Sequence, residues 1–353
     1  MMSGKKRFYT SGSERKELHG LLEAHNDGFA LDRKFYTSEF IYDYDIKYFW
    51  NQTWIWVGHI CQIPNPGDFF RFDYGPESIL VVRNREGIVS AFLNLCRHRG
   101  SRVCVESSGN KSVFSCPYHA WTYDLDGQLR MAKEMATCFD KKTHGLLKVH
   151  LKIFQGLIFI CTAQDPPDIN KAIEMLSPLT LPFRLERLKI ANQKSYLVSA
   201  NWKLAVENYM ECYHCAAAHK EYSRSHSLKD PASITSDLMT SLYDASKMAG
   251  LSNTNVSING VEVEDYDMDV YFARYPLYSG YQTGSENGEI LAPLLGDLKR
   301  PFGGANDLQL GIQNNFLIYS DYVVGYRFIP FSVKSTDMQV VWYVHQDAKE
   351  GRD

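Results

Sequence analysis

Between residues 42 and 165 the chain alternates apolar and polar positions in short runs. Segments such as FFRFDYG and SILVVRNREGIVSAFLNLC follow one another, with turn signals between them such as PNPGD at residues 64–68. Alternation with period two, interrupted by glycine and proline, is typical of short antiparallel strands. The pattern predicts a small antiparallel β-sandwich over residues 42–165, closed by GLIFICTAQ and followed by a linker at 165–168.

The chain after the linker mixes helical and strand patterns. We expect a helix near residues 170–176, a strand within 188–202 and a helix over 202–219. Three apolar runs near the end of the sequence are separated by short turns, which predicts an antiparallel meander. These runs span residues 308–320, 322–332 and 338–346.

Two stretches have a weaker pattern. Residues 223–305 are polar and irregular, and we expect loops and short helices there that form a lid. Residues 1–41 mix charged and aromatic side chains, with a helical pattern at 14–25, and we expect an arm packed on residues 166–353. The whole chain is therefore predicted to be an α+β protein. It would consist of the arm, the sandwich at 42–165, and an antiparallel sheet packed on helices at 166–353.

Composition and charge exclude several classes of function. A chain of 353 residues is long enough for two domains with cores, and a net charge of −3 gives no electrostatic basis for binding nucleic acid or an anionic membrane. No apolar run approaches the roughly 20 residues of a membrane-spanning helix, and no apolar segment follows the basic N-terminus as in a signal peptide. Eight cysteines in a chain of this length are expected to be mostly reduced thiols of a cytoplasmic protein.

Two cysteine–histidine pairs lie inside the predicted sandwich. Cys96 and His98 form C-x-H, and after 17 intervening residues Cys116 and His119 form C-x-x-H. Cysteine and histidine in chelating pairs indicate a metal site. Two thiolates on one iron and two imidazoles on the other make a Rieske [2Fe–2S] cluster, whose potential is raised by the neutral imidazoles. We therefore expect the two cysteines on one iron and the two histidines on the other.

A Cys2His2 zinc site is the alternative for these residues. Zinc fingers usually pair like ligands, whereas each pair here mixes cysteine with histidine. The flanking residues also suit a cluster loop, because Gly100 permits a tight turn and Pro117 stiffens the second loop. Tyr118 and Trp121 can supply an apolar cover. The spacing favours the iron–sulfur cluster.

A second candidate metal site lies in the helix predicted at 202–219. His214 and His219 are five residues apart, so they cannot share one face of a straight helix, where a spacing of three or four is needed. We expect the helix to end at 215–218, so that His219 swings in from the following turn. Two imidazoles and a carboxylate make the facial triad of non-haem Fe(II), with open positions for O2. Ordinary polar residues near a helix end are the alternative, but an electron carrier upstream requires an acceptor.

Together these motifs resemble the α subunits of Rieske non-haem iron oxygenases, which include aromatic-ring dioxygenases and several N- and O-demethylases. The resemblance covers essentially the whole length, through CRHRG, CPYHAW, NWK and E-N-x-x-E-x-Y-H-x4-H. It implies that His214 and His219 bind a mononuclear Fe(II). It also implies a homotrimer, in which Glu211 links this iron to His98 or His119 of the neighbouring subunit's cluster.

Two departures from the family pattern are informative. The bridging acid is usually aspartate, and Glu211 resembles instead the branch that oxidises quaternary ammonium compounds, as does the run ENYMECYHC. The third iron ligand of the family is a carboxylate on a helix after the last strand, whereas this sequence ends directly after that strand. We therefore expect a chain truncated at its C-terminus, with the third ligand beyond Asp353. Asp321 is a weak candidate within the chain.

The resemblance implies a Rieske domain, a catalytic domain of helix-grip type, and a terminal oxygenase that uses O2 to oxidise a small organic substrate. We find neither GxGxxG nor a P-loop in this sequence, so the NAD(P)H reductase, of flavin or ferredoxin type, is expected to be a separate polypeptide. The expected reaction is N-demethylation of a quaternary ammonium compound such as glycine betaine or carnitine. An aromatic-ring-hydroxylating dioxygenase is the alternative with the same fold. A Rieske electron-transfer module without oxygenase activity is the alternative of another class.

A pocket for a quaternary ammonium group is expected to offer aromatic faces, because cation–π attraction contributes about 2 kcal/mol or more when desolvated. For any single aromatic residue, a place in the core is the simpler expectation. The same family resemblance implies that Asn208 hydrogen-bonds near the iron, with an ordinary polar residue of the helix as the alternative. Cys212 and Cys215 are expected to be small buried residues, with a further metal site as the alternative. The candidate aromatic residues are Tyr209, Tyr213, Phe316, Tyr322 and Phe328.

Overall fold

The computed structural model describes residues 12–211, 214–227, 232–252, 261–263, 266–268 and 270–351. The described residues form two compact units. The smaller unit spans Trp54–Pro166, and the larger unit combines the residues before Trp54 with those after Pro166. Residues 42–53, which we expected at the start of the sandwich, thus belong to the larger unit. Among the described helices, none combines the length and the apolar character needed to cross a lipid bilayer.

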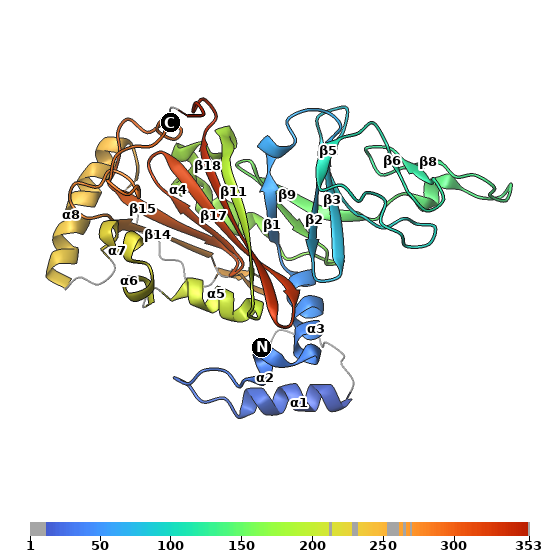
Figure 1. Cartoon of the computed structure of the whole chain (residues 1–353), viewed down its shortest axis with the longest axis horizontal. Helices are drawn as coiled ribbons and strands as arrows, with labels where there is room; N and C mark the ends of the chain where they lie inside the picture. The colour runs from blue at the N-terminus through green and yellow to red at the C-terminus, as the bar shows by residue number, and fades with distance from the viewer. Residues whose placement is uncertain are drawn as a thin grey trace. The chain divides into compact units, whose positions relative to one another are not determined.

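Seven antiparallel strands form the main sheet of the smaller unit (Figure 1). Their order is β1-β10-β9-β4-β3-β2-β5, so the first strand pairs with the last, and Ile55 lies opposite Ile160. The interior strand β3 buries consecutive apolar residues on both faces, as strands covered on both sides do. The strands are β1 (Ile55–His59), β2 (Asp68–Tyr74), β3 (Glu77–Arg83), β4 (Val89–Leu93), β5 (Ser108–Asn110), β9 (Lys148–Phe154) and β10 (Leu157–Cys161).

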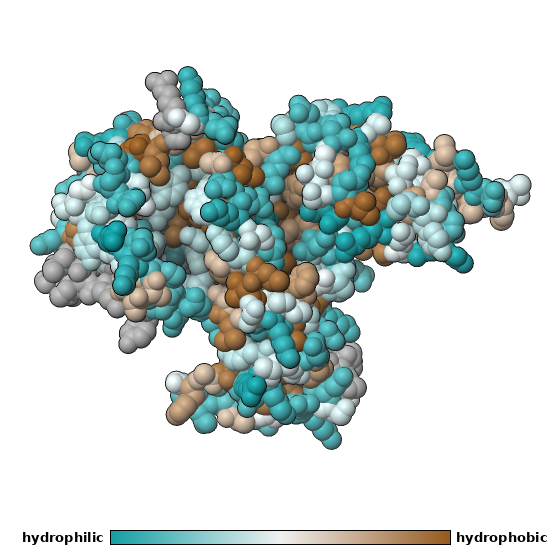
Figure 2. Space-filling model, in the orientation of Figure 1, coloured by the Kyte–Doolittle hydropathy of each residue, from teal (hydrophilic) through white to brown (hydrophobic). Residues whose placement is uncertain are grey.

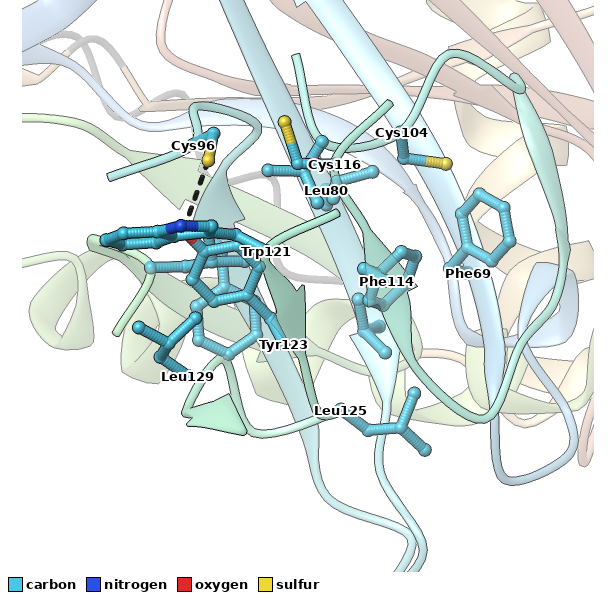
Figure 3. Packing of buried hydrophobic residues seen from close by; sticks show 14 residues of the cluster. Phe69, Leu80, Cys96, Cys104, Phe114, Cys116, Trp121, Tyr123, Leu125 and Leu129 are labelled. Atoms are coloured by element: carbon cyan, nitrogen blue, oxygen red, sulfur yellow. Dashed lines mark hydrogen bonds between the residues drawn. The ribbon is translucent and has the colours of Figure 1, made fainter. Parts of the chain in front are cut away.

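A smaller antiparallel sheet completes this unit. It consists of β6 (Phe114–Ser115), β7 (Thr122–Tyr123) and β8 (Leu129–Met131). The turn from β7 to β8 is held by the Asp124 carboxylate, which accepts the backbone N–H groups of Asp126 and Gln128. Figure 3 shows the core of this unit, in which aromatic and aliphatic side chains of the strands pack beneath two cysteines. The predicted antiparallel architecture is confirmed here.

Six antiparallel strands form the sheet of the larger unit, in the order β11-β18-β17-β16-β15-β14. Strands β14 to β18 form the expected meander, but the tail contains four strands instead of three. The run 308–320 is broken because Gly311 turns with φ 75° and its carbonyl accepts the N–H of Asn314. The strands are β11 (Leu188–Val198), β14 (Val270–Pro276), β15 (Gly304–Leu310), β16 (Asn314–Ile318), β17 (Tyr322–Ser332) and β18 (Ser335–His345).

The region 223–305 is more regular than its sequence indicated. It contains α8 (Ala232–Ala249), a helix of 18 residues, and the edge strand β14, as well as the hairpin of β12 (Val261–Val263) and β13 (Tyr266–Met268). Only part of the surface of this helix is buried, for example at Leu242, and the rest of its surface carries polar residues. The expected loops are present only in part, as turns and bends at 278–303.

The N-terminal segment packs against other residues of the larger unit, to which it belongs. The Tyr36 hydroxyl donates to the Glu207 carboxylate at 3.0 Å, and the Asp45 carboxylate accepts the indole N–H of Trp202 at 3.2 Å. The ring of Phe49 stacks on that of Trp202 with a centroid distance of 5.3 Å. The helices are α1 (Gly12–Glu23), α2 (Lys34–Thr37), α3 (Glu39–Tyr48), α4 (Asn170–Thr180), α5 (Trp202–Met210), α6 (Cys215–Ala218) and α7 (Lys220–Ser225).

Apolar side chains gather on part of the surface of the larger unit. Leu197 on β11, Leu204 on α5 and Phe331 on β17 are all exposed. Figure 2 shows apolar surface in the area of α5 and the turn between β17 and β18. Contiguous exposed apolar surface marks interaction sites more often than isolated residues do.

Buried His226 ties the end of α7 to the sheet. Its Nδ1 lies 2.9 Å from the carbonyl oxygen of Tyr222 and therefore carries the proton, which leaves Nε2 to accept the Tyr319 hydroxyl at 2.9 Å. The Tyr222 ring stacks on the imidazole at 3.7 Å. Burial lowers the pKa of His226 to about 4, so the imidazole is neutral near pH 7.

Acid is expected to destabilise the protein through His226. The unfolded chain binds a proton at this histidine near pH 6.5, whereas the folded protein does so only near pH 4. The free energy of unfolding should therefore fall by about 3 kcal/mol between these pH values. Urea unfolding of His226→Gln, measured across this range, should show a correspondingly flatter pH profile. The matched control is His25→Gln at an exposed position, and a wild-type slope in His226→Gln would contradict the prediction.

Candidate functional site

The two cysteine–histidine pairs lie in two loops of the smaller unit, one after β4 and one between β6 and β7. The loops have similar backbones. In the first, the N–H of Gly100 donates to the carbonyl of Cys96 at 2.9 Å, and in the second, that of Ala120 donates to the carbonyl of Cys116 at 3.0 Å. Gly100 (φ 72°) and Ala120 (φ 55°) both adopt the left-handed conformation that reverses the chain. Each loop therefore wraps one turn of backbone around its cysteine.

The cysteines and histidines differ in their exposure. Cys96 and Cys116 are each 3% exposed, whereas His98 is half-buried and His119 is exposed. The Tyr123 hydroxyl accepts the backbone N–H of Arg97 at 3.0 Å, so its own proton points to the Cys96 sulfur at 3.4 Å (Figure 3). The sulfur pair thus faces the core and the imidazole pair faces outward.

Aromatic side chains orient the two imidazoles. The His98 and His119 ring centroids are 4.7 Å apart, and Trp121 stacks on His98 at 4.9 Å with an interplanar angle of 10°. Tyr118 lies against His119 at 3.9 Å, as expected for a cover over this site. Burial lowers the pKa of His98, and the neighbouring His119 lowers it further, which keeps a lone pair available for a metal.

The arrangement fits a two-iron cluster. Burial raises the pKa of the Cys96 thiol, and Cys116 raises it further, so a thiolate pair here requires positive charge close by, which iron supplies. Within the part of the chain that the structure describes, no three His, Cys, Asp or Glu side chains converge in a way that could hold one metal ion. A buried thiol pair and an outward imidazole pair suit [2Fe–2S] better than tetrahedral zinc.

His214 and His219 flank a single helical turn. The helix expected over 202–219 is divided, because α5 ends at Met210 and α6 occupies Cys215–Ala218. The prediction that a helix ends at 215–218 is confirmed, because α6 ends at Ala218 and the non-helical His219 follows it, but a single helix from residue 202 is not formed. The Ser223 hydroxyl holds the second histidine by donating to its carbonyl at 2.8 Å.

The two imidazoles present their nitrogens to a common point. The Nε2 atoms of His214 and His219 are 3.0 Å apart. His214 Nδ1 lies 2.7 Å from the carbonyl oxygen of Glu211 and 3.2 Å from its Oε1, so Nδ1 carries the proton and Nε2 has the free lone pair. Two metal–nitrogen bonds of about 2.1 Å at a right angle place their nitrogens about 3 Å apart. The pair therefore fits adjacent positions on one mononuclear iron.

Three further candidates have different positions. The exposed Glu211 carboxylate contacts His214, as just described, whereas Asn208 is exposed on α5 and its side chain has no hydrogen bond among the described residues. Asp321 is buried, and its oxygens accept the Thr283 hydroxyl at 2.5 Å and the N–H of Leu291 at 2.7 Å. Asp321 thus holds a loop, and among the described side chains no carboxylate joins the two histidines in a metal-binding group.

One face of the larger unit's sheet is lined by tyrosines. Tyr209 of α5 packs on Tyr326 and Phe328 of β17, with centroid distances of 5.1 and 5.6 Å, so α5 covers this face. Tyr322 stacks on Tyr319 at 4.5 Å. We call this surface the tyrosine face; its aromatic residues are Tyr209, Tyr222, Tyr281, Tyr319, Tyr322, Tyr326, Phe328 and Trp342.

The expected aromatic residues are only partly on this face. Tyr209, Tyr322 and Phe328 belong to it, but Phe316 does not. Phe316 pairs with Gly325, whose neighbours on β17 point to the tyrosine face, so Phe316 points to the other side of the sheet. Tyr213 and Cys212 lie outside the described residues, and Cys215 is half-buried.

Several residues of this face were not anticipated from the sequence, among them Tyr222, Tyr319 and Tyr326. Only the strand alternation that puts Tyr322 and Tyr326 on one side was available as a signal. The others come from α7 and the end of β16, and only the fold brings them together.

The sequence resembles known families over most of its length. Residues 53–153 match the Rieske [2Fe-2S] domain, and residues 185–353 match the ring hydroxylating alpha subunit (catalytic domain). The glycine betaine monooxygenase oxygenase subunit of Pseudomonas aeruginosa is 33% identical over 342 residues, which are 96% of this chain and 79% of that protein. The carnitine monooxygenase oxygenase subunit of Acinetobacter baumannii is 31% identical over 205 residues, or 56% of this chain and 54% of that protein.

Solved structures share the same fold. A quaternary ammonium Rieske monooxygenase that oxidises carnitine aligns with a TM-score of 0.64 and 22% identity, over 90% of this chain and 76% of that one. Naphthalene 1,2-dioxygenase from Rhodococcus sp. aligns with a TM-score of 0.67 and 19% identity, over 96% of this chain and 79% of that one. The catalytic-domain match argues against an electron-transfer module alone. The chain therefore belongs to the Rieske non-haem iron oxygenases, as an oxygenase subunit with a [2Fe–2S] cluster and a mononuclear iron.

Proposed function

We propose that this chain removes a methyl group from a quaternary ammonium compound such as glycine betaine or carnitine. The observation that carries the proposal is the tyrosine face, which extends toward the helix break with His214 and His219. Several electron-rich rings on one face can attract a desolvated ammonium group, at about 2 kcal/mol or more for a favourable ring. The similarity to oxygenase subunits named for glycine betaine and carnitine supports the same substrate class.

The proposed reaction oxidises one N-methyl carbon. A hydroxyl group replaces one hydrogen of that methyl group, and the C–N bond then breaks to release formaldehyde. For glycine betaine, one O2, one NADH and one proton would give dimethylglycine, formaldehyde, water and NAD+. The cluster supplies electrons one at a time and the mononuclear iron supplies O2 activation. The residues of this chain bind the cation and keep the imidazole lone pairs directed at the metal.

Electron delivery in this proposal crosses a subunit boundary in a homotrimer. Glu211 is exposed and contacts His214, so its carboxylate can also accept the N–H of an outward cluster histidine from the next subunit. Exposed apolar residues near α5 and the β17–β18 turn support a subunit contact. The electrons would come from a separate NAD(P)H reductase. None of the described cysteines forms a disulfide, as expected for the cytoplasmic location that we propose.

Ring hydroxylation is the second candidate function. The α subunit of chlorobenzene dioxygenase from a Cupriavidus strain is 34% identical over 194 residues, which are 52% of this chain and 43% of that protein. That alignment covers about half of the chain, whereas the glycine betaine relative aligns over 96% of it. The longer alignment therefore favours a quaternary ammonium substrate over an arene.

The two functions are separated by their products. Full-length protein with a compatible reductase and NADH should release one formaldehyde per O2 consumed from glycine betaine or carnitine. With naphthalene or chlorobenzene, no cis-diol should form. A cis-diol without formaldehyde release from any quaternary ammonium compound would replace the proposal by the second candidate.

Cys116→Ser is expected to remove the [2Fe–2S] cluster, because the second loop would lose its thiolate. The measurement is the visible absorbance and the electron paramagnetic resonance signal of the reduced protein. Cys104→Ser is the matched control, since Cys104 is buried in the same hydrophobic core as Cys116 but is not a proposed ligand of the [2Fe–2S] cluster. Loss of the signal in both variants, or in neither, would contradict the ligand assignment.

Glu211→Ala is expected to lower turnover by about 10- to 100-fold, because His214 would lose the carboxylate at its Nδ1. The cluster signal should remain, and the rate of electron transfer from reduced cluster to substrate oxidation should account for the loss. Glu207→Ala, one helical turn earlier, removes a carboxylate that contacts Tyr36 instead and should retain most activity. Equal losses in the two variants would indicate a general defect of α5.

A further inference from the structure

Asp307 is a carboxylate on the same side of the sheet as the tyrosine face. It lies on the interior strand β15, opposite Ala273 on β14 and Leu317 on β16. Leu317 and Ala305, its neighbours on the same side of the sheet, belong to the buried cluster that includes the tyrosines. The next residue on that side, Gln309, donates to the Met210 sulfur at the end of α5 at 3.3 Å. Asp307 therefore lies on the side of the sheet that α5 covers.

This carboxylate has no compensating partner in the described structure. Among the described residues, neither an ion pair nor a side-chain hydrogen bond to Asp307 is found. Burial raises its pKa to about 7, yet the residue keeps part of its surface accessible, as at the wall of a concave site. A buried carboxylate without a counter-charge is destabilising. A ligand with a positive charge would remove that penalty.

Asp307 is linked to the histidine pair through Tyr326. Burial raises the pKa of Tyr326 to about 12, and the charges of Asp307 and Cys215 add to this effect, so both groups lie within electrostatic range of the Tyr326 hydroxyl. Cys215 directly follows His214. The carboxylate, the tyrosine ring and the first histidine thus border one region.

We infer that Asp307 is the counter-charge that binds the cationic nitrogen of the substrate within the tyrosine face. This inference rests on the proposed function and names the residue that selects for positive charge. Within the described part of the chain, Asp307 is not part of a metal-binding group with the histidines, which separates it from an iron ligand. An uncharged arene would leave the carboxylate buried and unpaired, so the same residue disfavours ring substrates.

The test compares two ligands of the same shape and different charge. Glycine betaine carries a trimethylammonium group, and 3,3-dimethylbutanoate replaces that nitrogen by carbon. Binding of each to the full-length holoprotein is measured by calorimetry without O2. Asp307→Asn should weaken glycine betaine binding by about 30-fold or more and leave 3,3-dimethylbutanoate unchanged or tighter. Asp307→Glu should retain the preference for the cation.

Asp337→Asn is the matched control. It makes the same chemical change on another strand of the same sheet, β18. Asp337 pairs with Ile329 and points away from the tyrosine face. Neither ligand should bind differently in this variant. Cluster absorbance and thermal unfolding confirm that each variant is folded.

The results that would overturn the role of Asp307 differ from those that would overturn the proposed function. If wild-type protein demethylates a quaternary ammonium compound but Asp307→Asn binds it equally well, the inference alone is overturned. Equal weakening of both ligands would overturn it as well, because it would show a structural role without charge selection. If wild-type protein releases no formaldehyde from any quaternary ammonium compound, the proposed function fails, and the inference fails with it.

Discussion

The short helical turn between His214 and His219 is the constraint on which the catalytic unit depends. Two imidazoles five residues apart can meet only if the chain leaves the helix near one of them, and α6 ends at Ala218, so that the non-helical His219 brings the two Nε2 atoms to 3.0 Å from each other. A second interruption separates α6 from α5. The same interruption places Glu211 at the end of α5, where its carboxylate and carbonyl fix the proton of His214 on Nδ1. Metal binding, ring orientation and the proposed electron path thus follow from two interruptions of one helical segment, after α5 and after α6.

The two metal sites follow different rules of burial. In the cluster loops, buried sulfurs and outward imidazoles place the charge of the cluster at the protein surface, where a redox partner can approach. In the catalytic unit, the histidines adjoin a sheet face that combines tyrosine rings with one buried carboxylate. The first arrangement suits the passage of electrons, and the second suits the selection of a small cation.

Expectations from the sequence were most successful where local chemistry decides the outcome. The C-x-H and C-x-x-H pairs and the antiparallel strands were visible as short-range patterns. The expectations failed where burial depends on distant partners. The 308–320 run was divided by Gly311, and the polar helix α8 was missed because its apolar positions are sparse. Which of the candidate aromatic residues lie on the tyrosine face, and which, like Phe316, lie in the core, could not be predicted. Asp307 escaped notice although a charge in an otherwise buried strand was a usable signal.

The sequence by itself determined the family, the two cofactors and the pairs of residues that can bind them, because ligand type and spacing are properties of a few neighbouring residues. Only the tertiary structure decided which residues share the tyrosine face with the histidines. Tyr209, Tyr222, Tyr326 and Asp307 come from four elements far apart in the chain, and strand register determines whether a side chain points to that face or away from it. Register and helix interruption are set by packing across the whole unit, so no local pattern could specify them.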